Sequence, residues 1–221
     1  MMGGTAEMAL VRAFREDANE TSVSDAVRIV RHGGVLAMPT DSVYALGACA
    51  FDEAAVRRVC AIKGQREQKP ILVLIADRSQ LDALVAYVPP AAAALMDRLW
   101  PGPLTIVLPA SPRLSAVLTA GTGTIGVRLP AQPLLAKLLH ATGPLTGTSA
   151  NRSGESPART ARDVAQSLGD DVDLILDGGP ASATLPSTVV DATGIVRVLR
   201  EGPIGRAAIQ AALAKEGIEV V

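Results

Sequence analysis

Aromatic side chains are scarce in this chain: its 221 residues include one Trp, two Tyr and two Phe, 2% of the total. Apolar residues nevertheless make up 48%. The core must therefore consist of Ala, Val, Leu and Ile, which suits an α/β fold with many thin helices. The scarcity of aromatic rings also argues against a surface that binds nucleic acid by stacking on bases.

A marked excess of either charge is also missing, since the formal net charge is -1. Nonspecific binding to nucleic acid requires a basic excess, so the composition predicts none, although a local basic groove is compatible with it. Cys49 and Cys60 lack the spacing of a zinc site and the number needed for a disulfide framework, so we expect two reduced thiols. His32 and His140 have no acidic cluster beside them, which argues against a His-based metal site or triad.

No run of residues combines the length and apolar purity of a signal peptide or a membrane span. The stretch 86–100 comes nearest, and Pro89, Pro90 and Asp97 interrupt it. We therefore expect a cytoplasmic protein with no membrane partner. The Walker sequence of P-loop nucleotidases is missing too.

Helical and strand patterns alternate along the chain. Helical patterns cover 22–34, 52–64, 77–88, 91–100, 132–143, 160–169 and 205–217, and strand patterns cover 35–38, 70–76, 100–110, 123–130, 144–151, 172–179, 187–192 and 195–200. This alternation favours one α/β domain over residues 23–221 with a large sheet. Because the last strands follow one another without helices, we expect that sheet to be mixed. Residues 1–22 are expected to form an N-terminal arm, either loose or an edge element.

Small polar clusters stand at the ends of four strand patterns, at 39–42, 127–130, 148–154 and 186–191. Any one of them fits a helix cap or a turn. Ligands of α/β proteins bind at the carboxyl ends of strands, so four such clusters together favour a ligand site.

A basic loop follows the second helical pattern and contains Lys63, Arg66 and Lys69. Cations in such a loop match a polyanion such as triphosphate. Lys63 also lies at a helix C-terminus, where the helix dipole favours a positive charge without any ligand. The dipole explains Arg66 and Lys69 less well, because both lie beyond the helix.

The motifs also resemble a known family. The segments are "MPTDSVYALG", "IKGQREQKPILVLI", "RLWPGPLTIVLP", "TIGVRLP", "TSANRSG", "STVVD" and "VLREGPI", in the order found in YrdC-like proteins, the threonylcarbamoyl-AMP synthases. The resemblance covers about residues 23–205 and implies a twisted mixed sheet flanked by helices around a large, basic concave face. It implies condensation of L-threonine, bicarbonate and ATP with release of pyrophosphate. Partner proteins would then transfer the threonylcarbamoyl group to an adenosine of tRNA.

The resemblance implies roles for individual residues as well. Threonine would be bound by Ser42, Tyr44, Arg128, Gly147 and Ser187. ATP would be bound by Lys63, Arg66, Lys69, Thr124, Ser149, Asn151 and Arg200, with Lys63 and Arg66 as the catalytic residues. Mg²⁺ would arrive with the nucleotide, so no metal ligands are expected from the protein itself.

Some positions differ from the family pattern: Gln65 stands where Arg is usual, and Leu74 where His is usual. Three alternatives therefore remain beside the synthase. One is a paralogue with altered acid specificity. Another is a module that binds double-stranded RNA or tRNA, and the third is a carbamoyl-transfer component of hydrogenase maturation.

Overall fold

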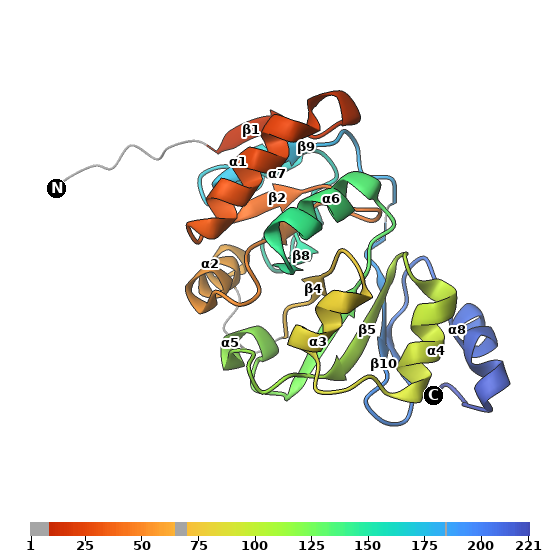
Figure 1. Ribbon diagram of the computed structural model, residues 1–221. Coiled ribbons are helices and arrows are strands. Elements are labelled where there is room, and N and C mark those ends of the chain that lie inside the picture. The colour runs from red at the N-terminus through yellow and green to blue at the C-terminus, as the bar shows by residue number, and fades with distance from the viewer. Residues whose placement is uncertain (1–8, 65–69, 184) are drawn as a thin grey trace.

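A computed structural model describes residues 9–64, 70–183 and 185–221 of the chain (Figure 1). Its strands form two mixed sheets. The first has the order β1 (Leu10–Ala13), β9 (Leu174–Asp177), β2 (Leu36–Met38), β3 (Ala45–Gly47) and β8 (Thr148–Ser149). The second has the order β11 (Arg197–Arg200), β10 (Thr188–Asp191), β5 (Leu104–Pro109), β6 (Thr124–Arg128), β4 (Val73–Leu74) and β7 (Leu145–Thr146).

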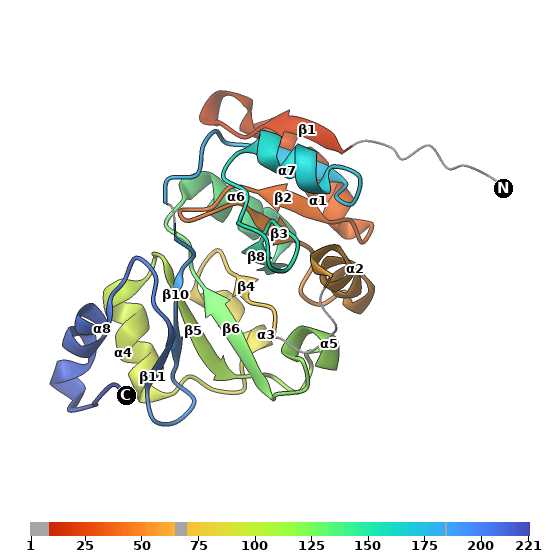
Figure 2. The same ribbon diagram turned by 180° about the vertical axis from the view of Figure 1, so that it is seen from behind.

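Both sheets combine parallel and antiparallel pairs. In the first sheet β9 pairs in parallel with β1 and β2, and β3 is antiparallel to β2 and β8. In the second, β10 is parallel to β5, β6 is antiparallel to β5, and β11 is antiparallel to β10 (Figure 2). The expectation of a mixed α/β architecture is therefore confirmed, but the strands form two sheets rather than one large one.

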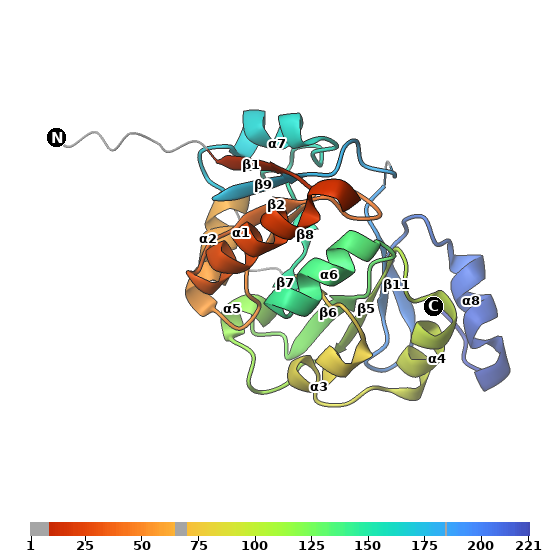
Figure 3. The same cartoon turned by 45° about the horizontal axis from the view of Figure 1, so that its top comes forward.

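Helices cover the two sheets separately. They are α1 (Asn19–Arg31), α2 (Glu53–Lys63), α3 (Leu81–Leu84), α4 (Pro90–Leu99), α5 (Ala116–Thr119), α6 (Pro133–Thr142), α7 (Ala161–Leu168) and α8 (Arg206–Leu213). Helices α1 and α6 pack side by side below the first sheet, and α7 lies on its other face (Figure 3). Helices α4 and α8 pack together beside the second sheet. No helix in the described ranges is long and apolar enough to cross a membrane.

Successive side chains of the central strands point to opposite faces of the sheet, and this alternation separates the core from the site. In β5, the side chains of Leu104, Ile106 and Leu108 are fully buried in the hydrophobic core. Thr105 and Val107 point to the opposite face, because successive side chains of a strand alternate. One hydrophobic cluster contains side chains of both sheets, including Leu46 of the first and Ile106 of the second.

Several helix ends lie where the sequence predicts them. Asp52 caps α2 by accepting hydrogen bonds from the backbone N–H groups of Ala54 and Ala55, and Gly64 ends the helix with φ 62°. Thr160 and Asp163 form a capping box at the start of α7. Such caps satisfy backbone groups that a helix end leaves without partners.

Other elements differ from the sequence-based expectation. The helix expected over 77–88 is a 3₁₀ turn followed by α3, which ends at Leu84 because Val85 turns extended and pairs with Ala110. Helix α1 begins at Asn19, inside the expected N-terminal arm, whereas residues 10–13 form the edge strand β1, which is one of the two expected alternatives for that arm. Strand β3 and helix α5 were not expected, since neither is long enough to show a clear periodicity.

We expect Ile106→Ala to lower the free energy of unfolding by about 3 to 4 kcal/mol, because it leaves a cavity in place of a fully buried side chain. Ile195→Ala is the matched control: Ile195 is 66% exposed, so its truncation should change stability by less than about 0.5 kcal/mol. Urea unfolding of both variants measures the two values. Equal losses would contradict the assignment of this face of β5 to the core.

Candidate functional site

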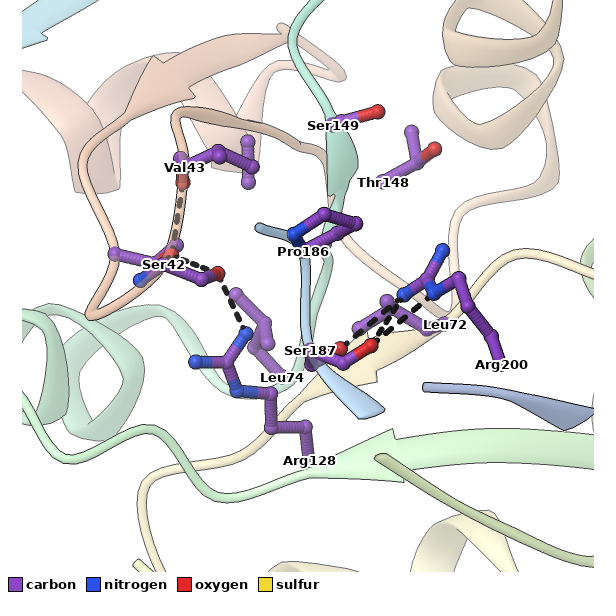
Figure 4. A pocket seen from close by; sticks show the side chains of 13 residues that line it. Ser42, Val43, Leu72, Leu74, Arg128, Thr148, Ser149, Pro186, Ser187 and Arg200 are labelled. Atoms are coloured by element: carbon purple, nitrogen blue, oxygen red, sulfur yellow. Dashed lines mark hydrogen bonds between the residues drawn. The ribbon is translucent and has the colours of Figure 1, made fainter. Parts of the chain in front are cut away.

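A small cavity of about 80 Å³ lies where the two sheets meet (Figure 4). Its polar wall includes the side chains of Ser42, Arg128, Ser149, Ser187 and Arg200. Its apolar wall consists of Val43, Ala45, Leu72, Leu74 and Pro186. The cavity thus presents two cations and several hydroxyl groups opposite an aliphatic surface.

Arg128 is the most constrained polar group of this cavity. It stands at the end of β6 and is 3% exposed. Its Nη1 donates to Ser42 Oγ at 2.8 Å, its Nη2 pairs with the carboxylate of Asp41, and its Nε donates to the carbonyl oxygen of Gly102 at 3.1 Å. A buried charge requires such partners, and together they fix the plane of the guanidinium.

Ser42 is held by the turn that follows β2. Thr40 Oγ1 accepts a hydrogen bond from the backbone N–H of Ser42 at 3.0 Å and donates to the carbonyl oxygen of Val43 at 2.8 Å. The hydroxyl groups of Thr40 and Ser42 are 3.0 Å apart. The polar cluster at the mouth of this buried strand therefore builds one wall of the cavity.

Arg200 lies across the cavity from Arg128. Its Nε and Nη2 donate to the carbonyl oxygen of Ser187 at 3.1 and 2.8 Å. Ser187 Oγ is in turn 2.8 Å from Thr105 Oγ1. Partial burial and the positive charge of Arg128 lower the pKa of Arg200, because both disfavour a charged guanidinium.

A second cavity, of about 360 Å³, extends along the open face of the second sheet. Its floor includes Thr105, Thr124, Gly126 and Val189. A Cβ atom at Gly126 would lie 3.2 Å from Thr105 Cγ2, so the lack of a side chain at this position leaves the floor open. The two cavities share Leu72, Thr148 and Arg200, and Arg200 therefore stands at their junction.

Lys63 is buried behind the first cavity. Its side chain is 3% exposed, and its Nζ donates to the carbonyl oxygen of Ser149 at 2.7 Å and to Asn151 Oδ1 at 2.9 Å. A longer contact of 3.3 Å reaches Ser149 Oγ. Burial lowers the pKa of Lys63 to about 8, against a weaker opposing effect of the negative charge of Glu155. The lysine thus anchors the strand that carries Ser149 to the end of α2.

The expected position of Tyr44 has to be corrected. Its fully buried side chain is not among those that line either cavity. The hydroxyl instead donates to the carbonyl oxygen of Gly179 at 2.7 Å and accepts from the N–H of Gly178 at 3.3 Å. Burial raises the pKa of Tyr44 to about 12. Its neighbours Val43 and Ala45 line the cavity, because side chains alternate along the chain here.

The structure brings together most of the residues that the sequence singles out. Ser42, Arg128, Gly147, Ser149, Ser187 and Arg200 line the first cavity, and Thr124 lines the second. Lys63 and Asn151 lie behind Ser149. Arg66 and Lys69 lie outside the described residues. The large basic concave face stays a prediction, since the charged side chains that line these two cavities in the described ranges are Arg128, Arg200 and Asp191.

Sequence reasoning missed three polar residues of the site. Thr40 and Thr148 line the first cavity, and Asp41 pairs with Arg128. Thr40 and Asp41 belong to the same polar cluster as Ser42, and that cluster is the signal that would have found them. A search of the described residues finds no group of three or more His, Cys, Asp or Glu that could hold a metal ion.

Comparison with known proteins identifies the family. The model of the Sua5/YciO/YrdC family, described as "Telomere recombination", matches residues 28–202. The chain belongs to this family. It is 38% identical over 187 residues to the threonylcarbamoyl-AMP synthase of Pyrococcus abyssi, covering 84% of this chain and 55% of that relative. The chain thus spans little more than half the length of this relative.

Solved structures show the same family likeness. The crystal structure of P. abyssi Sua5 complexed with L-threonine has a TM-score of 0.90 and 34% identity, covering 96% of this chain and 63% of that one. The crystal structure of Escherichia coli YciO has a TM-score of 0.81 and 32% identity, covering 89% of this chain and 97% of that one. The YrdC-like α/β fold, with mixed sheets flanked by helices, is therefore confirmed.

We expect the free energy of unfolding of the native protein to increase with pH more than that of the variant Lys63→Met. Between about pH 8 and pH 10 the folded protein has released the Lys63 proton while the unfolded chain still binds it, so the free energy of unfolding increases with pH. From pH 7 to pH 10 the native protein should gain on the order of 2 kcal/mol over this variant. Urea unfolding across this pH range measures the difference.

Lys137→Met provides the control, because Lys137 is exposed on α6 and its truncation should change the free energy of unfolding by less than about 0.5 kcal/mol. A Lys63→Met difference that stays constant across the pH range would contradict the buried position of Lys63.

Proposed function

We propose that the chain is an L-threonylcarbamoyladenylate synthase, which condenses L-threonine, bicarbonate and ATP and releases pyrophosphate. The product would supply the threonylcarbamoyl group for an adenosine of tRNA through separate transfer proteins. The observation that carries this proposal is a small cavity with an oriented arginine, Arg128, which opens through Arg200 onto a larger groove. Two substrates of unequal size can therefore meet at one point.

The lining of the small cavity suits an amino acid. Nη1 and Nη2 of Arg128 each carry a second N–H besides the one that Ser42 or Asp41 accepts, and these two can donate to a carboxylate. The orientation of the guanidinium by Asp41 and Ser42 reduces the entropy lost on binding. Ser187 adds a hydroxyl group, and Leu74 offers an aliphatic contact for the methyl group of threonine. At Gly147 a Cβ atom would lie 2.5 Å from Leu74 Cγ, so glycine leaves Leu74 in place. The relative solved with L-threonine supports this amino acid.

The larger groove fits the nucleotide. A nucleoside can lie flat over Thr124 and Gly126, with its phosphates directed toward Arg200 and Ser149 at the junction. Lys63 and Asn151 hold Ser149 in position, so in this arrangement they act on the phosphates from behind it. Arg66 and Lys69 are proposed to contact the triphosphate, and Mg²⁺ would be carried by the nucleotide.

The reaction requires positioning more than covalent chemistry by the protein. An oxygen of the threonine carbamate attacks the α-phosphorus, and the bond from that phosphorus to the leaving pyrophosphate breaks. Fixed cationic groups at the junction favour the transition state, because they meet two anions without having to reorganise. Arg200 occupies this place among the described residues.

Incubation of the protein with ATP, bicarbonate and L-threonine should release pyrophosphate in a threonine-dependent manner. Arg128→Gln should reduce kcat/KM for threonine at least about a hundredfold, since it removes the charge and the fork that bind the carboxylate. Arg113→Gln is the matched control, because Arg113 is exposed and lies outside both cavities. Replacing threonine by serine or valine in the assay tests whether Leu74 lowers the selectivity for threonine over other amino acids.

The proposal would be contradicted if none of these amino acids led to release of pyrophosphate. Salt-sensitive binding of double-stranded RNA or tRNA without ATP turnover would instead favour the RNA-binding alternative.

A further inference from the structure

Strand β11, at the edge of the second sheet, contains one residue more than the facing part of its partner β10 (Figure 2). Val198 pairs with Val190. The next pair joins Arg200 to Val189, so Leu199 has no partner on β10 among the described residues. This is a β-bulge, in which two residues of one strand oppose one residue of the other. Bulges change the direction of a side chain and are frequent beside functional sites.

The bulge turns two consecutive side chains toward the groove of about 360 Å³. In a regular strand Leu199 and Arg200 would point to opposite faces of the sheet, yet both line this groove. Leu199 is not required to place Arg200. If it were left out, Val198 and Arg200 would be neighbours, and alternation would still direct Val198 to the core and Arg200 to the groove. The bulge therefore adds one apolar side chain to the lining of the groove.

Leu199 stands on the margin of the groove, on the side of Arg200 away from the small cavity. It is 58% exposed and lines the groove alone, whereas Arg200 lines both cavities. Pro70 and Leu72 precede β4 and line the opposite margin, beyond β6. Neighbouring strands lie about 4.8 Å apart, so the floor formed by β10, β5 and β6 is about 10 Å across. Aliphatic side chains at both margins of such a floor suit a flat ring.

We infer that Leu199 binds the nucleobase of the nucleotide through an aliphatic contact with one face of the ring. This inference rests on the proposed function and deepens it, because it assigns one part of the groove to the base. Arg200 attracts the phosphates to the junction, and this directs the base away from the small cavity, toward Leu199. The contact leaves the polar edge of the ring free. It therefore favours a base without selecting among bases, since every base has such a face.

An aliphatic platform agrees with the composition of the chain. Single-stranded nucleic acids are commonly held by bases that stack on aromatic side chains. This chain has one Trp, two Tyr and two Phe, and in the described ranges none of them lines the groove. Removal of apolar surface from water can supply the same kind of attraction without an aromatic ring. The extra residue of the bulge provides that surface.

Titration calorimetry with ATP, in the absence of threonine and bicarbonate, measures this contact without turnover. Inorganic tripolyphosphate is the matched probe, because it has the phosphates and lacks the base. We expect Leu199→Ala to raise the Kd for ATP roughly tenfold, because it removes most of the aliphatic surface beside the base. The Kd for tripolyphosphate should stay unchanged in this variant, since Arg200 remains bonded to Ser187. In the pyrophosphate assay, the KM for ATP should rise by the same factor with kcat unchanged.

Ile195→Ala is the control, because Ile195 is 66% exposed in the turn between β10 and β11 and lies outside both cavities. It should leave both Kd values as in the native protein. Leu199→Phe should bind ATP at least as tightly as the native protein, since an aromatic ring also stacks on a base. Circular dichroism checks the folding of each variant. If Leu199→Ala is unfolded, Leu199→Thr decides the question, because threonine suits a strand and lacks most of the aliphatic surface.

Three results would overturn the inference alone. The first is an unchanged Kd and KM for ATP in the folded Leu199 variant. The second is native protein that binds ATP no more tightly than tripolyphosphate, and the third is an equal loss for both ligands in the variant. In each case threonine-dependent pyrophosphate release would leave the proposed function intact. Failure of ATP and tripolyphosphate to bind, together with no pyrophosphate release, would overturn the proposed function and the inference with it.

Discussion

The site depends on the hydrogen bonds of one buried guanidinium. Arg128 belongs to β6 of the second sheet, yet its partners Asp41 and Ser42 belong to the turn after β2 of the first. A charge that is 3% exposed cannot remain unpaired, so this interaction holds the two sheets in register across the cavity. Removal of one partner from such a buried pair typically costs about 3 to 5 kcal/mol. The same contacts that stabilise the junction also orient the group that would bind substrate.

In the second sheet, side chains alternate between a face that forms the core and a face that stays open at the junction of the two cavities. Ile106 and its neighbours of the same face form the core, and this leaves the opposite face free for Thr105, Thr124 and Gly126. The polar turn after β2 of the first sheet lines the small cavity beside that face. The cavity of about 80 Å³ and the groove of about 360 Å³ therefore share a boundary at Arg200. This combination would suit the proposed joining of a small acid to a nucleotide.

Local sequence signals account for much of the fold. The caps of α2 and the apolar strands could be predicted, because each depends on neighbouring residues in the chain. Convergence of Ser42, Arg128 and Ser187 also follows, since ligand sites collect at strand ends. The division into two sheets and the direction of Tyr44 could not be predicted, because they depend on contacts between distant segments. The burial of Lys63 could not be predicted either, because it depends on a hydrogen bond to Asn151, which is distant in the sequence.

The central claim is that Arg128 is positioned in advance to bind the carboxylate of an amino acid. A crystal structure of the protein with bound L-threonine tests it most directly. The account predicts that the threonine carboxylate lies within hydrogen-bonding distance of the Arg128 guanidinium, which still contacts Asp41. Threonine bound elsewhere, or bound in this cavity with its carboxylate turned away from Arg128, would contradict it.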